Sequence, residues 1–465
     1  MYRDLWFSGH QVELPEMLSG RERRVERQER LLAEAARHAG EDAEHCLVCF
    51  TLNIAGPVKV CAASAIAFDA GCGEIGLALE RAFGEGSFVC VGVFRNAYGP
   101  EGFWSVRRDA REVKRLLTET EEHHPLGRLF DIDVISPDGT KISRTDIGME
   151  ARRCLICGRN AADCAGSRRH SVRDLQEETC TMVLDYASDP LSRADLSDLA
   201  GHIAASAMMA EVQTTPKPGL VDRANNGSHR DMDLTAFERS AAALEWYFSE
   251  CERIGAAAAM DGVLPDEVFP GLRSLGLTAE KDMYAAAGAN THKGLIFSLG
   301  IICAAWGMSG SSDPEAVLGL AGMIAAPAAD ELTESGLRGA GARAEAAAGF
   351  PTLREIAIPA FDEAIDRGLD TETAGVYTLL RCIAGTEDTN MIRRGGRETA
   401  ARMRERAAQA ADVCRDGFGP EQLREAAVRL DDEFIRLNLS PGGSADLLAL
   451  TYFMVMIREL GTWDR

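Results

Sequence analysis

The chain of 465 residues carries 72 Asp and Glu against 50 Lys and Arg, which gives a formal net charge of −22, and 46% of its residues are hydrophobic. This length and hydrophobic fraction predict two or three folded domains and exclude a largely disordered chain. The negative charge argues against nucleic acid as a partner, because duplex binding requires an excess of Lys and Arg that replaces phosphate counterions.

The start of the chain and its apolar runs predict the compartment. Residues 1–7 lack the basic start and apolar run of a signal peptide. The longest apolar runs that we identify, 295–306 and 447–457, are shorter than the roughly 20 residues that cross a bilayer. Thirteen cysteines, an odd number, do not suggest a disulfide framework. We therefore expect a cytoplasmic protein without a membrane partner.

Residues 45–145 alternate short β-rich runs with charged amphipathic stretches. Runs of this kind predict an α/β or α+β domain. Strands are expected at 45–52, 88–94, 103–106 and 128–135, and helices at 21–39 and 109–122. Ser136-Pro-Asp-Gly139 has the composition of a hairpin turn between the last of these strands and residues 141–144.

An acidic pair lies in the last of these expected strands. The period of two residues places Asp131 and Asp133 on one face, where they could share a metal ion. Arg128 lies close by and could contact a phosphate group. An isolated Asp-x-Asp pair can also be two solvated carboxylates, so the pattern alone does not assign a site.

Four potential zinc ligands follow. Cys154, Cys157, Cys164 and His170 form a C-x₂-C-x₆-C-x₅-H series. Reduced structural thiols are the alternative interpretation of the three cysteines. The series therefore predicts either a structural Zn²⁺ site or a group of buried thiols.

From about residue 191, Ala, Leu, Arg and Glu recur with a period of 3.6 residues, and clusters of Gly, Pro and Asn interrupt the pattern. This pattern predicts an all-α C-terminal domain. We expect the domains to span residues 1–188 and 189–465, with residues 186–192 as the linker.

Rare polar residues of this second half concentrate in three predicted loops, at 214–233, 288–294 and 388–396. The loops hold two of its three Lys, two of its three His and four of its five Asn. Asp222, Asp231, Asp233 and Asp388 offer oxygen ligands of the kind that hold Mg²⁺ with phosphates. Cations in the same loops could bind phosphate oxygens, and no P-loop or dinucleotide fingerprint is present. The loops therefore predict an unusual nucleotide site.

Motifs in this half resemble the triphosphoribosyl-dephospho-CoA synthases across about residues 195–460. They are Thr215–Arg223, Asn226–Asp233, Asn290–Gly294, Gly349–Pro351, Asp388–Asn390 with Arg394–Gly396, and Ser440–Asp446. The resemblance implies a reaction in which ATP and 3′-dephospho-CoA combine and adenine is released. The chain departs from that pattern at Arg343-Ala-Glu345 and in an apparently longer segment at 336–341.

The resemblance and the chemistry of the loops together suggest roles. We expect Mg²⁺ (or Mn²⁺) at Asp231, Asp233 and Asp388, and either Asp222 or Glu345 as the catalytic base. Substrate and phosphate contacts are expected from Lys217, Asn226, His229, Asn290, Thr291, His292, Lys293, Asn390 and Arg394.

The N-terminal half, over about residues 12–180, is similar to the apo-citrate lyase phosphoribosyl-dephospho-CoA transferases. The similarity lies in Gln28, Asn53–Lys59, His124–Val134, Ile142–Arg144, Arg153–Cys157 and Ser167–Ser171, with departures at Ala55 and Gly166. It implies transfer of the prosthetic group to a serine of the citrate lyase acyl carrier protein (the gamma subunit), with release of pyrophosphate. Asp131 and Asp133 would then be catalytic Mg²⁺ ligands, and Lys59, Arg128 and Arg144 would bind the phosphates.

The two resemblances predict a bifunctional enzyme that builds and then attaches the citrate lyase prosthetic group. Three alternatives stay open at this point. One is the equivalent enzyme of malonate decarboxylase maturation. Another is a single active synthase fused to a zinc-bearing module that recruits the carrier. The third is a hydrolase that cleaves the glycosidic bond of a nucleotide.

Overall fold

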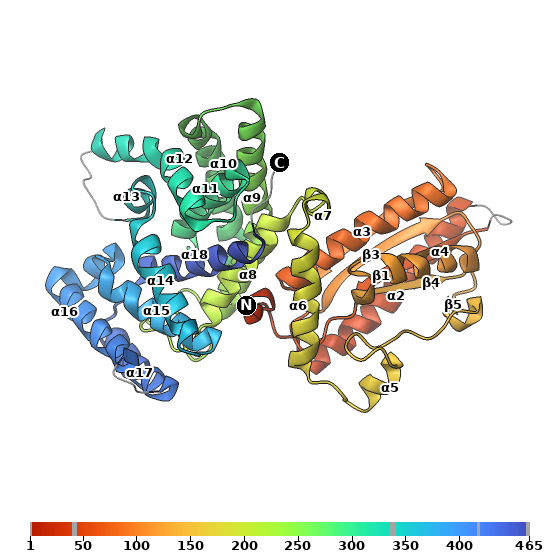
Figure 1. The fold of residues 1–465 in the computed structure, drawn as a ribbon, viewed down its shortest axis with the longest axis horizontal. Coiled ribbons are helices and arrows are strands. Elements are labelled where there is room, and N and C mark those ends of the chain that lie inside the picture. Colours follow the sequence, from red (N-terminus) through yellow and green to blue (C-terminus); the bar gives the residue numbers. More distant parts are fainter. Residues whose placement is uncertain (1, 40–43, 335–340, 416–418, 462–465) are drawn as a thin grey trace. The chain divides into compact units, whose positions relative to one another are not determined.

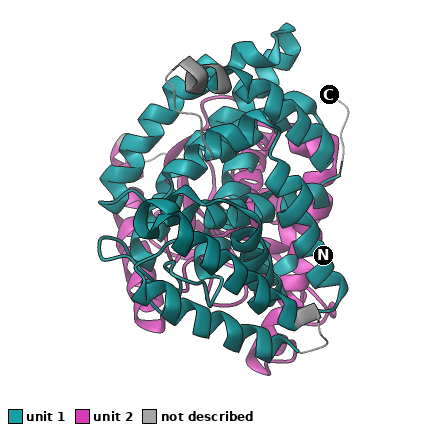
Figure 2. Ribbon diagram, turned by 90° about the vertical axis from the view of Figure 1, so that its left-hand side faces the viewer, with its two compact units in different colours: residues 1–8, 197–465 teal, residues 9–196 magenta. Residues whose placement is uncertain are grey.

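The computed structural model describes residues 2–39, 44–334, 341–415 and 419–461. The chain divides into two compact units, one of residues 9–196 and one of residues 1–8 with 197–465 (Figure 2). The predicted fold class, an α/β or α+β region followed by a helical region, is confirmed (Figure 1). The predicted division at residue 188 stays a prediction for the functional domains.

Residues 9–196 are built on a five-stranded sheet in the order β2-β3-β1-β4-β5, with every neighbouring pair antiparallel. The strands are β1 (Cys46–Leu52), β2 (Phe88–Asn96), β3 (Gly99–Val106), β4 (Phe130–Ile135) and β5 (Lys141–Ile142). The helices and 3₁₀ turns are α2 (Leu14–Ala39), α3 (Ala62–Phe83), α4 (Ala110–His123), η1 (Gly127–Leu129), η2 (Thr145–Ile147), α5 (Ala161–Gly166), α6 (Val172–Ser188) and α7 (Pro190–Ala194).

The two faces of this sheet bury different side chains. On one face Leu31 of α2 packs with Leu47, Cys49 and Phe103 of the sheet. On the other face Phe68 of α3 stacks on Phe50 with ring centroids 5.1 Å apart. Alternation along β1 explains the division, because neighbouring residues of a strand point to opposite faces.

The expected strands and amphipathic helices of this unit are confirmed, with shifted ends. The hairpin is also confirmed, because Val134 pairs with Ile142 and the Ser136 N–H donates to the Thr140 carbonyl at 2.9 Å. Two features differ. The expected linker is occupied by the end of α6 and by α7. The apolar helix α3 was not predicted; it is long and apolar enough to cross a membrane, but 67% of its most apolar stretch is buried, as expected of a core helix.

In the second unit all the regular elements among the described residues are helices. Its elements are α1 (Arg3–Trp6), α8 (Leu199–Gln213), α9 (Leu234–Asp261), α10 (Pro265–Ala287), α11 (Lys293–Ser309), α12 (Pro314–Glu334), α13 (Ala342–Ala347), the π-turn η3 (Leu353–Ala357), α14 (Ile358–Asp366), α15 (Thr371–Gly385), α16 (Thr389–Arg415), α17 (Pro420–Arg436) and α18 (Gly442–Glu459). Most residues of α8, α11 and α18 are themselves buried, so these three helices form the centre of the unit.

Small residues allow two of these helices to approach closely. A Cβ on Gly255 of α9 would lie 1.9 Å from the Ala304 carbonyl oxygen of α11, and one on Gly307 would lie 2.1 Å from the Glu252 carbonyl oxygen. Any larger residue would push the helices apart. This contact holds α11 in place, and the first turn of α11 carries residues of the site described below.

The first residues of the chain belong to the helical unit. Trp6 is fully buried, and its Nε1–H donates to Glu459 Oε2 at 2.9 Å. The Tyr2 hydroxyl donates to Asp362 Oδ1 at 2.9 Å, and Arg458 pairs with the same carboxylate. The N-terminal segment is therefore fastened to α14 and α18 by both packing and charge.

Candidate active sites

The helical unit contains a cavity of about 800 Å³, where the three predicted loops meet. It is lined by most of the residues predicted to bind substrate or metal or to act as the base. They are Lys217, His229, Asp231, Asn290, Thr291, His292, Lys293, Glu345, Asp388, Asn390 and Arg394. The lining does not include Asp222, Asn226 or Asp233. The segment at 336–341 lies outside the described residues except for Gly341.

A buried ion pair forms one wall of the cavity. Lys217 is 1% exposed, and its ammonium pairs with the carboxylate of Glu211 in α8. Burial raises the pKa of Glu211, and the charge of Lys217 opposes this rise. Removing either partner alone would leave an uncompensated charge in the interior. Sequence reasoning missed Glu211 because it lies within an Ala- and Met-rich helix.

Two of the predicted acids hold the loop rather than facing the cavity. Asp222 accepts hydrogen bonds from the backbone N–H groups of Ala224 at 2.7 Å, Asn225 at 3.0 Å and Lys217 at 2.9 Å. Asp233 caps α9 through the Ala236 N–H at 2.9 Å. Asn226 is exposed, and its carbonyl accepts from the His229 N–H at 3.0 Å. These contacts fix the shape of the 217–236 loop.

Asp388 and Glu345 line the cavity and also bind the backbone. Asp388 accepts from the N–H groups of Asn390 at 2.8 Å and Ser444 at 3.2 Å, so it joins the starts of α16 and α18. Glu345 accepts from the N–H of Thr352 at 2.6 Å and from its hydroxyl at 3.1 Å. Burial raises the pKa of both carboxyl groups, against the effect of these donors.

A further carboxylate in the cavity, Asp446 near the start of α18, has no such partner. No hydrogen bond reaches its side chain from any residue that the structure describes. Burial raises the pKa of Asp446 well above its usual range, and the neighbouring Glu211 and Asp388 add to the effect. Its Oδ2 lies so close to Gly294 that a Cβ there would be 2.2 Å away. Asp446 is the last residue of the Ser440–Asp446 motif, but nothing in the sequence distinguished it from the other acids.

Two histidines, His229 and His292, line the cavity, and burial lowers the pKa of both. Burial and then Lys217 lower the pKa of His292 to about 3, and its Nδ1 lies 2.7 Å from Ser240 Oγ. Its Nε2 is buried without a partner among the described residues, as is Thr291 Oγ1. His229 Nε2 lies 2.8 Å from Ser440 Oγ. Because buried polar atoms are normally hydrogen-bonded, the two unpartnered atoms suggest contacts with a ligand.

Cations at the cavity have protein partners that phosphate could replace. Lys293 pairs with Glu280 at 2.7 Å, and Arg394 donates to the Ser228 carbonyl at 3.0 Å. Arg393 also lines the cavity and donates to the Asn390 side chain at 3.0 Å. These exposed and half-buried groups supply local positive charge within an acidic unit.

The sheet unit brings its own predicted acids together. Asp131 and Asp133 lie on the face of β4 that also carries α2, because their strand partners are Thr51 and Cys49. Thr51 Oγ1 donates to Asp131 Oδ2 at 3.4 Å. Burial raises the pKa of Asp133, while its ion pair with Lys141 opposes the rise.

Beside this pair lies a second cavity of about 400 Å³, lined by four arginines. They are Arg128, Arg144, Arg152 and Arg153. Arg152 links the cavity to the acidic pair, since its Nη1 lies 3.7 Å from Asp131 Oδ1. Lys59 is not part of this lining; its ammonium donates to the Ile54 carbonyl at 2.5 Å, and burial, followed by the charge of Arg21, lowers its pKa.

Glu121, which sequence reasoning missed, organises these groups from α4. One carboxylate oxygen accepts from the Ile132 N–H and from Arg152, both at 3.0 Å, and the other accepts from Arg144 at 2.5 Å. Its side chain is 2% exposed. Lys114, also buried on α4, donates to the Ile132 carbonyl at 2.6 Å. The sequence placed both residues in a charged amphipathic helix and gave them no role, because helical periodicity does not identify which charges face a site.

We expect Glu121→Gln to raise the KM for the phosphate substrate of this unit about tenfold, because the neutral amide would bind Arg144 and Arg152 less strongly. Initial rates over a range of substrate concentrations would measure this change. Glu119→Gln, on an exposed position of the same helix, is the control. An unchanged KM in the folded Glu121→Gln protein would contradict the positioning role.

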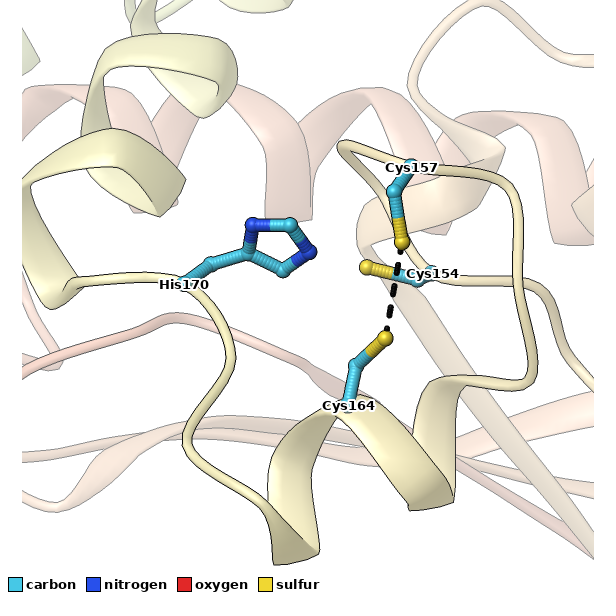
Figure 3. A group of neighbouring side chains, drawn as sticks. All are labelled: Cys154, Cys157, Cys164 and His170. Atoms are coloured by element: carbon cyan, nitrogen blue, oxygen red, sulfur yellow. Dashed lines mark hydrogen bonds between the residues drawn. The ribbon is translucent and has the colours of Figure 1, made fainter.

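The predicted zinc ligands converge. Their four ligand atoms lie within 4.8 Å of one another, and we call Cys154, Cys157, Cys164 and His170 the Cys/His cluster (Figure 3). Cys157 Sγ and Cys164 Sγ are 3.5 Å apart. His170 Nε2 points toward the sulfur atoms and is buried without a partner among the described residues (Figure 3). This cluster could hold a metal ion.

Hydrogen bonds favour the thiolate form of one cysteine in the cluster, Cys157. The N–H of Arg159 and the His170 side chain lower the pKa of Cys157 to about 6, whereas burial and the neighbouring Cys157 raise that of Cys164 to about 11. Within the described part of the chain, no group of three acidic, His or Cys ligands other than the Cys/His cluster is assembled this closely. Asp231, Asp233 and Asp388 are thus not brought together as a preformed set.

Comparison with known families matches both units. Residues 12–186 match the family of apo-citrate lyase phosphoribosyl-dephospho-CoA transferases. Residues 197–338 and 329–465 match the ATP:dephospho-CoA triphosphoribosyl transferases. Protein CitXG of Haemophilus influenzae is 31% identical over 97% of this chain and 97% of its own length. The chain belongs to the CitXG family. It is therefore a bifunctional transferase of citrate lyase prosthetic-group biosynthesis.

Other relatives agree with this assignment. Protein CitXG of Leuconostoc mesenteroides subsp. cremoris is 30% identical over 98% of this chain and 99% of its own length. A probable 2-(5''-triphosphoribosyl)-3'-dephosphocoenzyme-A synthase of Vibrio cholerae is 37% identical over 57% of this chain and 90% of its own length. The CitXG relatives thus share the order of the two units.

Proposed function

We propose that the helical unit joins ATP to 3′-dephospho-CoA and that the sheet unit transfers the product to a serine of the citrate lyase acyl carrier protein. The observation that best supports two separate reactions is that each unit has its own cavity with its own acids and cations. We also propose that the enzyme works in the cytoplasm and that both steps use Mg²⁺.

In the first reaction the bond between C1′ of the ATP ribose and N9 of adenine breaks, and its electron pair leaves with adenine, which takes up one proton. A new bond forms between C1′ and the 2′-oxygen of the dephospho-CoA ribose, which loses its proton. Asp446 is the residue that we propose as the base, because its oxygens are not held by the backbone. Its raised pKa brings the carboxylate nearer to the basicity that proton abstraction requires at neutral pH.

The other groups of this cavity would bind the triphosphate. Lys293 and Arg394 are proposed to contact phosphate oxygens, and Thr291 and His292 to donate hydrogen bonds. Mg²⁺ usually retains several waters and takes one or two carboxylates together with substrate phosphates. Asp231 and Asp388, which line the cavity, suit that role. We assign Asp222, Asn226 and Asp233 to shaping the loop, on the strength of their backbone contacts.

In the second reaction the serine hydroxyl of the carrier loses its proton and attacks the α-phosphorus of the triphosphoribosyl group. The bond from this phosphorus to the oxygen bridging to the β-phosphate breaks, and pyrophosphate leaves with its electrons. Asp131 and Asp133 would hold Mg²⁺, and the arginines of the 400 Å³ cavity would stabilise the charge on the leaving group. Zn²⁺ is the proposed occupant of the Cys/His cluster, since three thiols and one imidazole suit a closed tetrahedral site.

Separate product assays test the proposal. We expect adenine release from ATP only when dephospho-CoA is present, and pyrophosphate release only when the carrier is added as well. Adenine release without dephospho-CoA would instead support a nucleotide hydrolase. Labelling of a malonate decarboxylase carrier in preference to the citrate lyase carrier would contradict the proposed acceptor.

A further inference from the structure

Residues 143–171, which carry Arg144, Arg152 and Arg153, have almost no hydrophobic core. Within this segment the only buried side chains are Cys154 and Cys164. Its regular structure is limited to the 3₁₀ turn η2 and the six-residue helix α5. A segment of this length cannot bury enough apolar surface to offset the entropy of ordering its backbone.

The same segment delivers the arginines to the cavity of the sheet unit. Arg152 reaches Glu121, the Phe130 carbonyl and Asp131, and the carbonyl of Arg153 accepts from Arg128 at 2.5 Å. The positions of these groups therefore depend on the backbone at 152–153.

That backbone continues directly into the Cys/His cluster. The N–H of Ala161 donates to the Arg152 carbonyl at 2.9 Å, and the Cys154 N–H donates to the Arg159 carbonyl at 2.5 Å. Arg153 and Asn160 form an isolated antiparallel bridge. The loop between Cys154 and Cys164 is thus hydrogen-bonded to the backbone on either side of Arg153. At the centre of the cluster, the buried Nε2 of His170 still lacks a partner among the residues described.

We propose that Zn²⁺ at the Cys/His cluster holds residues 143–171 folded and thereby places Arg144 and Arg152 in the cavity of the sheet unit. The cluster is then a positioning element of pyrophosphate release and not a docking module separate from the chemistry. The link to pyrophosphate release rests on the proposed function. The claim that zinc keeps residues 143–171 folded does not.

The test uses the 465-residue chain, purified without chelator, and compares it with its Cys154→Ser variant. Cys90→Ser is the matched control, because Cys90 is exposed on β2 and lies outside the cluster. Three quantities are measured: zinc content, hydrogen exchange of peptides from 143–171 and from β1, and the separate rates of adenine and pyrophosphate release.

We expect about one zinc per chain in the parent and in Cys90→Ser, and much less in Cys154→Ser. In Cys154→Ser, residues 143–171 should exchange faster while β1 stays protected, and pyrophosphate release should fall about 100-fold. Adenine release should stay within about twofold. Chelation of the parent should reproduce these changes, and added Zn²⁺ should reverse them, which separates metal loss from an irreversible folding defect.

Two results would overturn the inference. One is a parent protein without zinc whose residues 143–171 are nevertheless protected from exchange. The other is a zinc-free protein that keeps its exchange pattern and its rate of pyrophosphate release. If the parent releases no pyrophosphate with the carrier, the proposed function fails, and zinc content and exchange still decide whether the metal orders the segment.

Discussion

Asp131→Asn should reduce pyrophosphate release from the triphosphoribosyl substrate on the order of a thousandfold, with adenine release unchanged. The substitution keeps the shape of the side chain and removes the negative charge proposed to hold Mg²⁺. Asp131 Oδ1 lies 3.7 Å from Nη1 of Arg152, which lines the cavity, and Asp131 Oδ2 accepts from the hydroxyl of Thr51 in the neighbouring strand. A stopped assay for pyrophosphate with purified intermediate and carrier would give the rate.

The control for this variant is Asp185→Asn, an exposed carboxylate in α6 of the same unit. It should leave both rates unchanged. If Asp131→Asn labelled the carrier at the parental rate, the assignment of the acidic pair would be wrong. If it slowed adenine release to the same extent, the separation of the two reactions would fail instead.

Asp446→Asn should reduce adenine release by about 10²- to 10⁴-fold, the range expected when a positioned base is removed. The binding of ATP should change little, because the amide retains the size of the carboxyl group. Pyrophosphate release from supplied intermediate should stay at the parental rate, since that step belongs to the other unit. Chromatographic detection of free adenine would measure the effect.

A second substitution tests the position of Asp446 without removing it. Gly294→Ala would place a methyl group 2.2 Å from Asp446 Oδ2, so the carboxylate must move. We expect a loss of adenine release here as well. Asp432→Asn, exposed on α17, is the control for charge. Parental rates in both Asp446→Asn and Gly294→Ala would show that another group accepts the proton.

The sequence predicted those parts of the fold whose signal is periodic. The amphipathic helices of the sheet unit were correctly identified because each has one buried and one exposed face. The strands were identified by their short runs of β-branched and aromatic residues, since β1 is buried on both faces and carries no alternation. Helix α3 was missed because its Ala, Gly and Ile residues are buried over most of its surface and therefore show little amphipathic pattern.

The sites were predicted to the extent that rare polar residues gather in loops. Lys217, His229, His292 and Asp388 were found in this way, and the structure brings them to one cavity. Their individual contacts could not be predicted, since Asp222 and Asp446 look alike in sequence. One is held by backbone donors and the other is not.

Residues inside regular helices were the hardest to assign. Glu121 is one of seven charged residues of α4, and Glu211 lies in an apolar run. Only tertiary packing decides that both are buried and paired with cations. Helical periodicity indicates which face is apolar, but it does not identify a buried charge that binds a partner from a distant segment.

The most direct test of the account is mass spectrometry of apo-acyl carrier protein of citrate lyase after incubation with this protein, ATP, 3′-dephospho-CoA and Mg²⁺. We expect a carrier whose mass has increased by one phosphoribosyl-dephospho-CoA group on a serine, and no increase when either nucleotide is omitted. A carrier that stays unmodified in the complete mixture, while a CitXG relative modifies it under the same conditions, would contradict the account.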